Sequence, residues 1–416
     1  MTPFASPNEQ MDVIRRGALE VIPEAELVRK LEHAASTATP LIIKQGFDPT
    51  RPDLHIGHAV SMRKLRDFQE LGHQVVFVVG DYTARVGDPS GRSETRPRLS
   101  PDEIEANART YADQVGHILD VAKVRIEYNS QWLAPLDLAN ILELTATYTV
   151  ARMLERDDFA QRYADNRPIS VMEFLYPLMQ AYDSVALHAD VELGGTDQKF
   201  NLLVARTVQE RYGQPPQVCL IMPLLRGTDG EQKMSKSYDN YVGIAQAPEE
   251  QFGRTMSIPD ALLDEWIRLA TDWSGETLET AIRNAATDPY QAKRALARRI
   301  VSLFHGDNAA AAAEAHFDRL FRDHAAPDDV PLVHVDLLDP PLRYDPERGV
   351  RLAPLLVSTA LAASNAEAVR LIEQGAIAVD GQRIDDRNAT IALDDGAIRM
   401  LRRGKRQYVR VAARTD

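Results

Sequence analysis

An alternation of strand-like and helix-like segments fills the first half of the chain and constrains its fold most. Apolar runs rich in β-branched and aromatic residues lie at residues 41–47, 74–80, 123–128, 191–193 and 218–225. Between them, apolar residues recur at helical spacing, as at residues 58–71, 136–155, 171–188 and 196–212. This alternation predicts an α/β fold with a parallel sheet and helices on both faces. We assign residues 1–225 to such a Rossmann-like domain, in which ligands bind beyond the carboxyl ends of the strands.

The second half of the chain has a different pattern. Residues from about 248 to 323 are helical with few strand signals, and we assign residues 226–325 to an α-helical middle domain. Prolines then crowd residues 326–350, which predicts a linker; they are Pro327, Pro331, Pro340, Pro341 and Pro346. Residues 351–416 form a small α+β unit, with a helix that starts at Ser364 and a tight hairpin at Asp380-Gly381.

Composition excludes several classes of protein. No apolar stretch is long enough to cross a bilayer, and the first twenty residues lack a secretory signal. Cys219 is the only cysteine, so no internal disulfide and no cysteine metal cluster can form, and we expect a reducing cytoplasm. The net charge is −13, but residues 351–416 hold 11 Lys and Arg against 8 Asp and Glu. This local excess of positive charge indicates a surface for a polyanion.

Two short motifs suggest chemistry at phosphorus. His55-Ile56-Gly57-His58 follows the first strand and opens a helix, and Lys233-Met234-Ser235-Lys236-Ser237 lies in a polar loop. Helix N-termini bind phosphate through free N–H groups and the helix dipole. Lysines supply the charge that a departing pyrophosphate needs. Alone, each motif has an ordinary explanation, namely a helix start or a solvated loop, but together they favour displacement on a nucleoside triphosphate.

A third group of polar residues shares one face of a predicted helix. Tyr176, Gln180 and Asp183 are spaced by four and three residues. On a helix packed against a sheet, such a face is costly unless it meets a polar ligand. The alternative is a solvent-exposed polar stripe. Asp88, in Gly-Asp-Pro-Ser-Gly, is by itself an ordinary turn residue.

The two motifs, in this order and at this separation, resemble the class I aminoacyl-tRNA synthetases. Longer stretches resemble the tyrosyl-tRNA synthetase family; they are residues 44–50, 86–92, 176–183 and 193–198. The last 66 residues resemble an S4-type RNA-binding domain. The resemblance covers nearly the whole chain. Where many members of the family have Tyr, this chain has Lys44, a change that is typical of a second subgroup of bacterial enzymes. The chain resembles that subgroup more closely. Arg92 likewise stands where many members have Lys.

The resemblance implies a two-step ligase. Tyrosine and ATP would form tyrosyl-adenylate and release pyrophosphate, and the tyrosyl group would then pass to the 3′ end of tRNA(Tyr). Mg²⁺ would arrive with ATP, with no tightly bound cofactor and no dedicated metal site. The family also implies a homodimer formed by a helical insertion around residues 130–190, an anticodon-binding role for residues 226–325, no membrane association and a cytoplasmic location.

The resemblance also implies residue roles. The groups acting on the phosphates would be Thr50, His55, His58, Lys233 and Lys236. The other ATP-binding residues would be Asp48, Gly57, Gly195, Asp197, Met234 and Ser235. Tyrosine would be bound by Lys44, Gly46, Asp88, Tyr176, Gln180, Asp183 and Gln198. Asp183 would accept a hydrogen bond from the tyrosine hydroxyl. In many members, the Tyr at the position of Lys44 also contacts this hydroxyl; whether Lys44 replaces that contact or pairs elsewhere is left open.

Three other functions remain to be separated. One is a nucleotidyl transferase that makes an adenylate without tRNA, which leaves the S4-like tail unexplained. Another is a non-catalytic RNA-binding protein built on a decayed synthetase, against which the intact motifs argue. The third is specificity for tryptophan, against which Asp183 and the tail argue. ATP–pyrophosphate exchange with each of the twenty amino acids separates them all.

Overall fold

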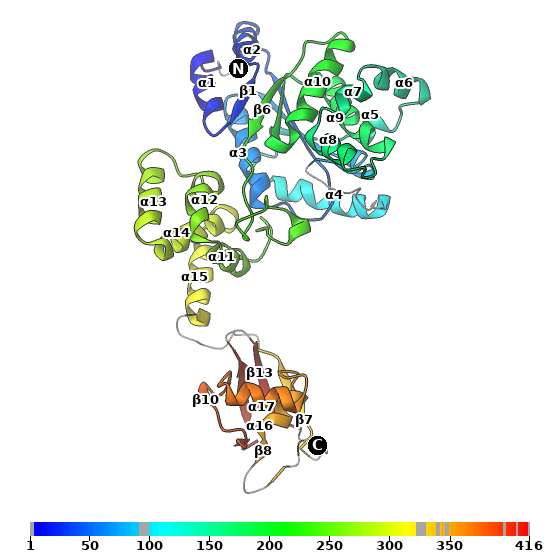
Figure 1. Cartoon of the computed structure of the whole chain (residues 1–416). Helices are drawn as coiled ribbons and strands as arrows, with labels where there is room; N and C mark the ends of the chain where they lie inside the picture. Colours follow the sequence, from blue (N-terminus) through cyan, green and yellow to red (C-terminus); the bar gives the residue numbers. More distant parts are fainter. Residues whose placement is uncertain are drawn as a thin grey trace. The chain divides into compact units, whose positions relative to one another are not determined.

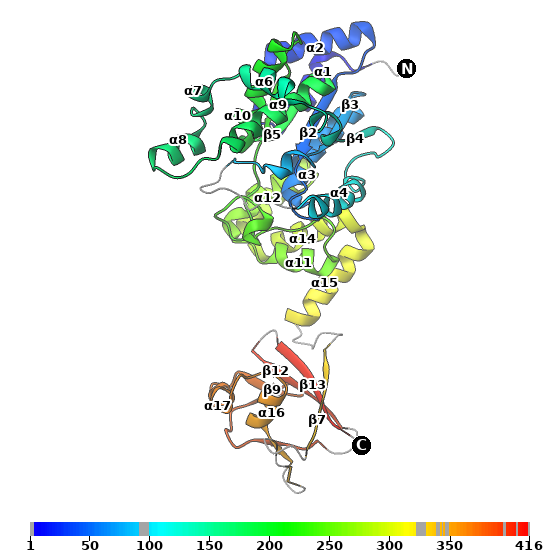
Figure 2. The same cartoon turned by 90° about the vertical axis from the view of Figure 1, so that its right-hand side faces the viewer.

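The structure is a computed structural model that describes residues 4–90, 100–321, 330–337, 342, 344–345, 349–393, 397–404 and 407–414. The chain divides into two compact units, Met1–Glu314 and Ala315–Asp416. Figures 1 and 2 show the elements of each unit in two views. The finer division of the chain into a catalytic domain, a middle domain, a linker and a tail stays a prediction. Arg92 lies outside the described residues.

A six-stranded sheet forms the centre of the first unit, in the order β1-β6-β5-β2-β3-β4. Its strands are β1 (Glu20–Ile22), β2 (Ile42–Phe47), β3 (Gln74–Val79), β4 (Val124–Tyr128), β5 (Val191–Gly195) and β6 (Val218–Met222). All neighbours pair in parallel except β1, which runs antiparallel to β6. The predicted parallel α/β sheet is therefore confirmed. The sequence analysis missed β1, whose three residues carry no alternating pattern.

Helices cover both faces of this sheet (Figure 1). On β3, Val75 and Phe77 belong to the core that includes α3 (Ile56–Glu70), whereas Val76 packs with Leu187 of α9 (Leu175–Leu187). On β6, Cys219 likewise packs with Leu202 of α10 (Lys199–Arg211). Successive strand side chains point to opposite faces, so a strand buried on both sides reads as a continuous apolar run.

Helix starts follow the capping residues. Ser100 caps α4 (Pro101–Val115) in a full capping box with Glu103. The single helix predicted over residues 136–155 is wrong, because the chain forms α6 (Leu138–Ala146) and then α7 (Val150–Met153). The side chain of Thr149 accepts a hydrogen bond from the Arg152 N–H and so starts a new helix. The remaining helices before β6 are α1 (Pro7–Arg15), α2 (Glu24–Thr37), α5 (Ser130–Leu133) and α8 (Asp157–Ala164).

Helices also dominate residues 248–321, as the sequence predicts. They are α11 (Pro248–Met256), α12 (Leu263–Ala270), α13 (Gly275–Thr287), α14 (Pro289–His305) and α15 (Asp307–Phe321). Helix α14 packs against α11, α12 and α13, and α12 also contacts α3. Among the described residues, none of the helices is long and apolar enough to span a membrane.

The second unit is built on a sheet in the order β10-β9-β12-β13-β7. Its elements are β7 (Leu332–Val335), β8 (Val350–Arg351), α16 (Leu352–Ser358), α17 (Asn365–Glu373), β9 (Ile377–Val379), β10 (Gln382–Ile384), β11 (Thr390–Ile391), β12 (Ile398–Arg403) and β13 (Gln407–Ala413). Asp380 and Gly381, both with positive φ, form the predicted hairpin turn. Strand β7 lies within residues 326–350 and pairs with β13. Of the five prolines noted there, the described residues include only Pro331.

Candidate active site

A cavity of about 540 Å³ lies at the carboxyl ends of the parallel strands. Its walls include residues that follow β2, β3, β5 and β6, the first turn of α3, and the loop at residues 233–238. Every predicted site residue except Lys44 lines this cavity. The volume suits a small-molecule ligand. The sheet topology therefore brings together residues that the sequence places up to about 190 positions apart.

The two histidines stack at the N-terminus of α3, with ring centroids 3.6 Å apart. The backbone N–H of His55 donates to Nδ1 of His58 over 3.2 Å, so His58 carries its proton on Nε2. Burial, with added repulsion from Lys236 and Lys233, lowers the pKa of His55 to about 3. Burial also holds the pKa of His58 well below its usual value. Both rings are therefore neutral at pH 7 and can donate hydrogen bonds without carrying charge.

Both loop lysines are already paired within the cavity. Nζ of Lys233 lies 2.5 Å from Oδ2 of Asp197, the predicted ribose-binding residue. Nζ of Lys236 donates to the Tyr111 hydroxyl and to the Arg51 carbonyl, each over 3.1 Å. Burial lowers the pKa of Lys236 to about 7. Any ligand that pairs with these lysines must first displace these partners.

The polar face of α9 points into the cavity. Tyr176 and Asp183 are only 7% and 3% exposed, so a solvent-exposed polar stripe is excluded. The Tyr176 hydroxyl donates to Asp48 over 3.0 Å, and Asp48 also accepts from Thr83 over 2.7 Å. Gly80 has to be glycine, because a Cβ there would collide with both Asp48 and Thr83.

Asp183 is held by two donors. Nε1 of Trp132 donates to Oδ1 over 2.7 Å, and Nδ2 of Asn129 donates to Oδ2 over 3.3 Å. Burial raises the pKa of Asp183 to about 6, against the opposing effects of Lys44, Trp132 and Asn129. The carboxylate is therefore ionised at pH 7 and is an acceptor at the wall of the cavity.

Gln198, which lines the cavity, is the centre of a further hydrogen-bond network. Its Nε2 donates to Oδ2 of Asp88 over 2.7 Å, and its Oε1 accepts from Nδ2 of Asn201 over 3.0 Å. Arg156, 5% exposed, donates to Asn201 and lies 3.8 Å from Asp88. Asp88 is therefore part of a buried network as well as a turn, since it also accepts from the N–H of Ser90.

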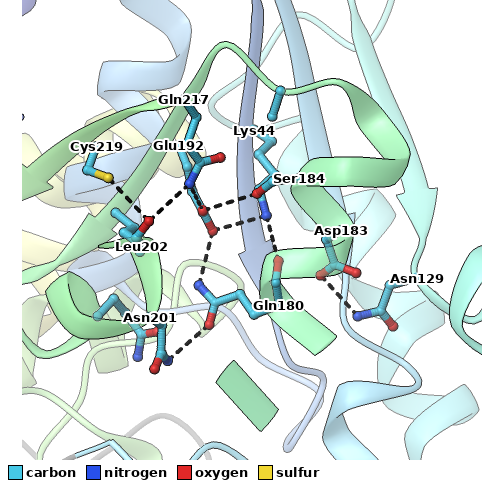
Figure 3. A network of polar contacts seen from close by, with 12 residues as sticks. Lys44, Asn129, Gln180, Asp183, Ser184, Glu192, Asn201, Leu202, Gln217 and Cys219 are labelled. Atoms are coloured by element: carbon cyan, nitrogen blue, oxygen red, sulfur yellow. Dashed lines mark hydrogen bonds and ion pairs between the residues drawn. The ribbon is translucent and has the colours of Figure 1, made fainter. Parts of the chain in front are cut away.

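Lys44, which was predicted to bind tyrosine, does not line the cavity. It lies two residues before Gly46 on β2, which places it about 7 Å deeper below the edge of the sheet. There Nζ lies 3.1 Å from Oε1 of Glu192, and each side chain is 1% exposed. Figure 3 shows both residues of this pair in contact with Gln180.

The sequence analysis missed several side chains that hold the predicted residues. They are Tyr111, Asn129, Trp132, Arg156 and Glu192. Only Asn129 carries a usable signal, because it directly follows a predicted strand, at the edge where ligands bind. Within the described part of the chain, no group of three or more His, Cys, Asp or Glu side chains is arranged to hold a metal ion.

Comparison with known proteins adds independent findings. Residues 36–322 match the family described as tRNA synthetases class I (W and Y), and residues 328–411 match the tyrosine–tRNA ligase SYY-like C-terminal domain. The tyrosine–tRNA ligase of Moorella thermoacetica is 49% identical over 97% of this chain and 95% of that protein. The tyrosine–tRNA ligase of Geobacter sulfurreducens is 48% identical over 97% of this chain and 98% of that protein.

A solved structure has the same fold. The tyrosyl-tRNA synthetase of Archaeoglobus fulgidus, in complex with L-tyrosine, aligns with a TM-score of 0.60 at 24% identity. The alignment covers 74% of this chain and 100% of that chain. At this identity the likeness supports the fold alone.

Proposed function

This chain belongs to the tyrosine–tRNA ligase family of class I synthetases, and from that membership we propose how its cavity activates tyrosine and charges tRNA. The observation that carries the proposal is a single cavity lined by both histidines, both loop lysines and the polar face of α9. Asp183 is the acceptor for the tyrosine hydroxyl. Gln180 and Tyr176, with Asp88, hold the ammonium, and Gln198 binds the same end of the substrate.

The first step is a displacement at the α-phosphorus of ATP. A carboxylate oxygen of tyrosine forms the new P–O bond, and the bond to pyrophosphate breaks. His55 and His58 donate hydrogen bonds as neutral rings, with Thr50 beside them, and Lys233 and Lys236 neutralise the leaving pyrophosphate. ATP enters as its Mg²⁺ complex. Its nucleoside rests against Asp48, Gly57, Gly195, Asp197, Met234 and Ser235, which line the same cavity.

The second step moves the tyrosyl group from the adenylate to a ribose hydroxyl at the 3′ end of tRNA(Tyr), and AMP leaves. We propose that residues 226–325 and the S4-like residues 351–416 bind this tRNA in the cytoplasm. The positive charge of residues 351–416 supports this role.

A homodimer through residues 130–190 is part of the proposal. Large apolar side chains are exposed there on several short helices, which supports a second copy of the chain as the partner. They are Leu138, Leu142, Val150, Tyr163 and Val171. Val171, the most exposed of them at 79%, offers the test. Val171→Asp should dissociate the dimer in analytical ultracentrifugation, whereas Val121→Asp, outside this segment, should not. A monomeric parent protein would refute the dimer.

The function itself is tested by ATP–pyrophosphate exchange with each amino acid. Tyrosine should support exchange, and phenylalanine and tryptophan should support far less. Gln180→Met should raise the tyrosine KM, because the ammonium loses an acceptor. An exchange that responds equally to tyrosine and tryptophan would contradict the placement of Asp183.

A further inference from the structure

Glu192 of β5 lies behind the cavity and has no place in the reaction as described. Its side chain is 1% exposed and does not line the cavity. Its carboxylate accepts hydrogen bonds from Nε2 of Gln180 over 3.0 Å, from the Ser184 hydroxyl over 3.4 Å, and from Nε2 of Gln217. Figure 3 shows these donors converging on Glu192.

Lys44 holds this carboxylate in place. The two residues face each other across the parallel pairing of β2 with β5, and their charged atoms are 3.1 Å apart. A buried carboxylate without a partner would be strongly unfavourable, so the ammonium and the amide donors are required. Nζ of Lys44 also donates to the backbone carbonyl of Gln180 over 3.1 Å. One ammonium therefore fixes both the carboxylate and the α9 residue that the carboxylate contacts.

The contact determines which end of the Gln180 carboxamide is available. A carboxamide has a donor end and an acceptor end of nearly equal shape. An ionised carboxylate only accepts, so Nε2 of Gln180 must face Glu192. Its Oε1 is then turned toward Nδ2 of Asn201, over 3.0 Å, and Gln180 lines the cavity. The reversed carboxamide would place oxygen against carboxylate and amide against amide, which loses two hydrogen bonds.

The carboxamide groups of Asn201 and Gln198 are held in fixed orientations as well. Asn201 donates from Nδ2 to Gln180 and to Gln198, because its own Oδ1 accepts from Arg156 over 3.1 Å. Both glutamine oxygens are therefore acceptors of fixed orientation. An acceptor at position 180 suits a cation such as the substrate ammonium.

We infer that Glu192, held by Lys44, is a positioning residue that turns the Gln180 carboxamide oxygen toward the ammonium of the substrate. The inference rests on the proposed role of Gln180. It assigns Lys44 to the support of ammonium recognition, in place of a contact with the tyrosine hydroxyl.

Two ligands of equal shape test it. Tyramine carries the ammonium, and 4-propylphenol has a methyl group in its place. Dissociation constants for both are measured by isothermal titration with the full chain. In Lys44→Met/Glu192→Met, which replaces the pair with apolar side chains of similar volume, tyramine should bind about tenfold more weakly. The affinity for 4-propylphenol should change by less than about twofold, since no bond to the ammonium is involved.

Two further variants keep the test decisive if the double variant does not fold. Glu192→Asp retains the charge but withdraws the acceptor from Gln180, and it should also weaken tyramine selectively. Glu192→Gln retains an acceptor at the same place and should stay close to the parent. Ser184→Ala, which removes a donor to Glu192 that does not touch the Gln180 carboxamide, is the matched control and should change neither affinity.

Each other result has a separate meaning. Equal weakening of both ligands in the double variant and in Glu192→Asp would overturn the inference, because it indicates general damage to the cavity. Unchanged tyramine binding in these variants would overturn it as well. If the affinity for tyramine fell equally in Glu192→Gln and in the double variant, the charge of Glu192 would matter and the orientation of the Gln180 carboxamide would not. This result would also overturn the inference. If the parent protein bound tyramine no better than 4-propylphenol, the proposed role of Gln180 itself would fail.

Discussion

Asp183→Asn should stabilise the first unit at high pH while it damages tyrosine recognition. Burial raises the pKa of Asp183 from 3.8 to about 6, so the folded state holds this proton more tightly than the unfolded state does. A raised pKa favours folding at low pH, and this contribution is lost as the pH rises through 6. Relative to a side chain that does not titrate, Asp183 then costs the fold about 3 kcal/mol at pH 8 and about 1.5 kcal/mol at pH 5.

The replacement also removes a hydrogen bond. The new asparagine side chain can still accept from Trp132, but its amide would meet the donor of Asn129, which lies 3.3 Å from Oδ2 of Asp183 in the parent. This loss is about 1 kcal/mol at any pH. The variant should therefore be more stable than the parent by about 2 kcal/mol at pH 8 and by less than about 1 kcal/mol at pH 5. The difference of about 1.5 kcal/mol between the two pH values does not depend on the lost bond.

Urea unfolding followed by tryptophan fluorescence measures this difference. The three tryptophans, Trp132, Trp266 and Trp273, all lie in the first unit and so report its unfolding alone. Asp264→Asn, on an exposed pair with Arg268, is the control and should change stability by less than about 1 kcal/mol at both pH values. A stability gain that is equal at pH 5 and pH 8, or larger at pH 5, would refute the reasoning. The same variant should lose discrimination between tyrosine and phenylalanine, an effect for which tyrosyl-tRNA synthetases are themselves the standard case.

Three further predictions concern the loop and the tail. Lys236→Ala should slow adenylate formation by about 10²-fold or more with tyrosine affinity retained, and an unchanged single-turnover rate would contradict its role. Because the pKa of Lys236 is lowered to about 7, kcat/KM for ATP should fall as the pH rises above 7. Lys236→Arg should lose this pH dependence. A pH-independent kcat/KM in the parent protein would contradict the role of protonated Lys236. A chain that ends at Phe321 should still form tyrosyl-adenylate but charge tRNA poorly. The affinity of the full chain for tRNA should fall as the salt concentration rises. Normal tRNA charging by the shortened chain would exclude a role for the tail in tRNA binding.

The fold was predictable because its signals are local. Strands such as Gln74–Val79 are buried on both faces and therefore read as continuous apolar runs. The meeting of His55 with Lys233 also followed from the sequence, since each lies on a segment that follows a predicted strand at the same edge of the sheet. Asp183 lies on a helix, and only the family resemblance placed it at this site. The break at Thr149 was missed because a capping threonine inside an apolar helical pattern is easily taken for an ordinary helix residue.

The supporting contacts depend on pairings that local patterns do not specify. Lys44 meets Glu192 only because β2 and β5, separated by more than a hundred residues, are neighbours in register. Trp132 of α5 donates a hydrogen bond to Asp183 of α9. The sequence between these two helices has no periodic pattern from which this contact could be predicted. The sequence therefore indicated which residues line the cavity, with the exception of Lys44, and the structure was needed to find what holds them.

Within the two motifs, the positive charge comes from the loop and not from the helix start. The low pKa values of His55 and His58 mean that the helix start offers neutral donors and no cation. The positive side chains of the two motifs are Lys233 and Lys236, which contact Asp197 and Tyr111. In the reaction that we propose, ATP displaces these partners, and the lysines exchange a carboxylate and a phenol for phosphate oxygens. In that proposal the loop supplies the transition-state stabilisation, and the histidines fix the direction of attack.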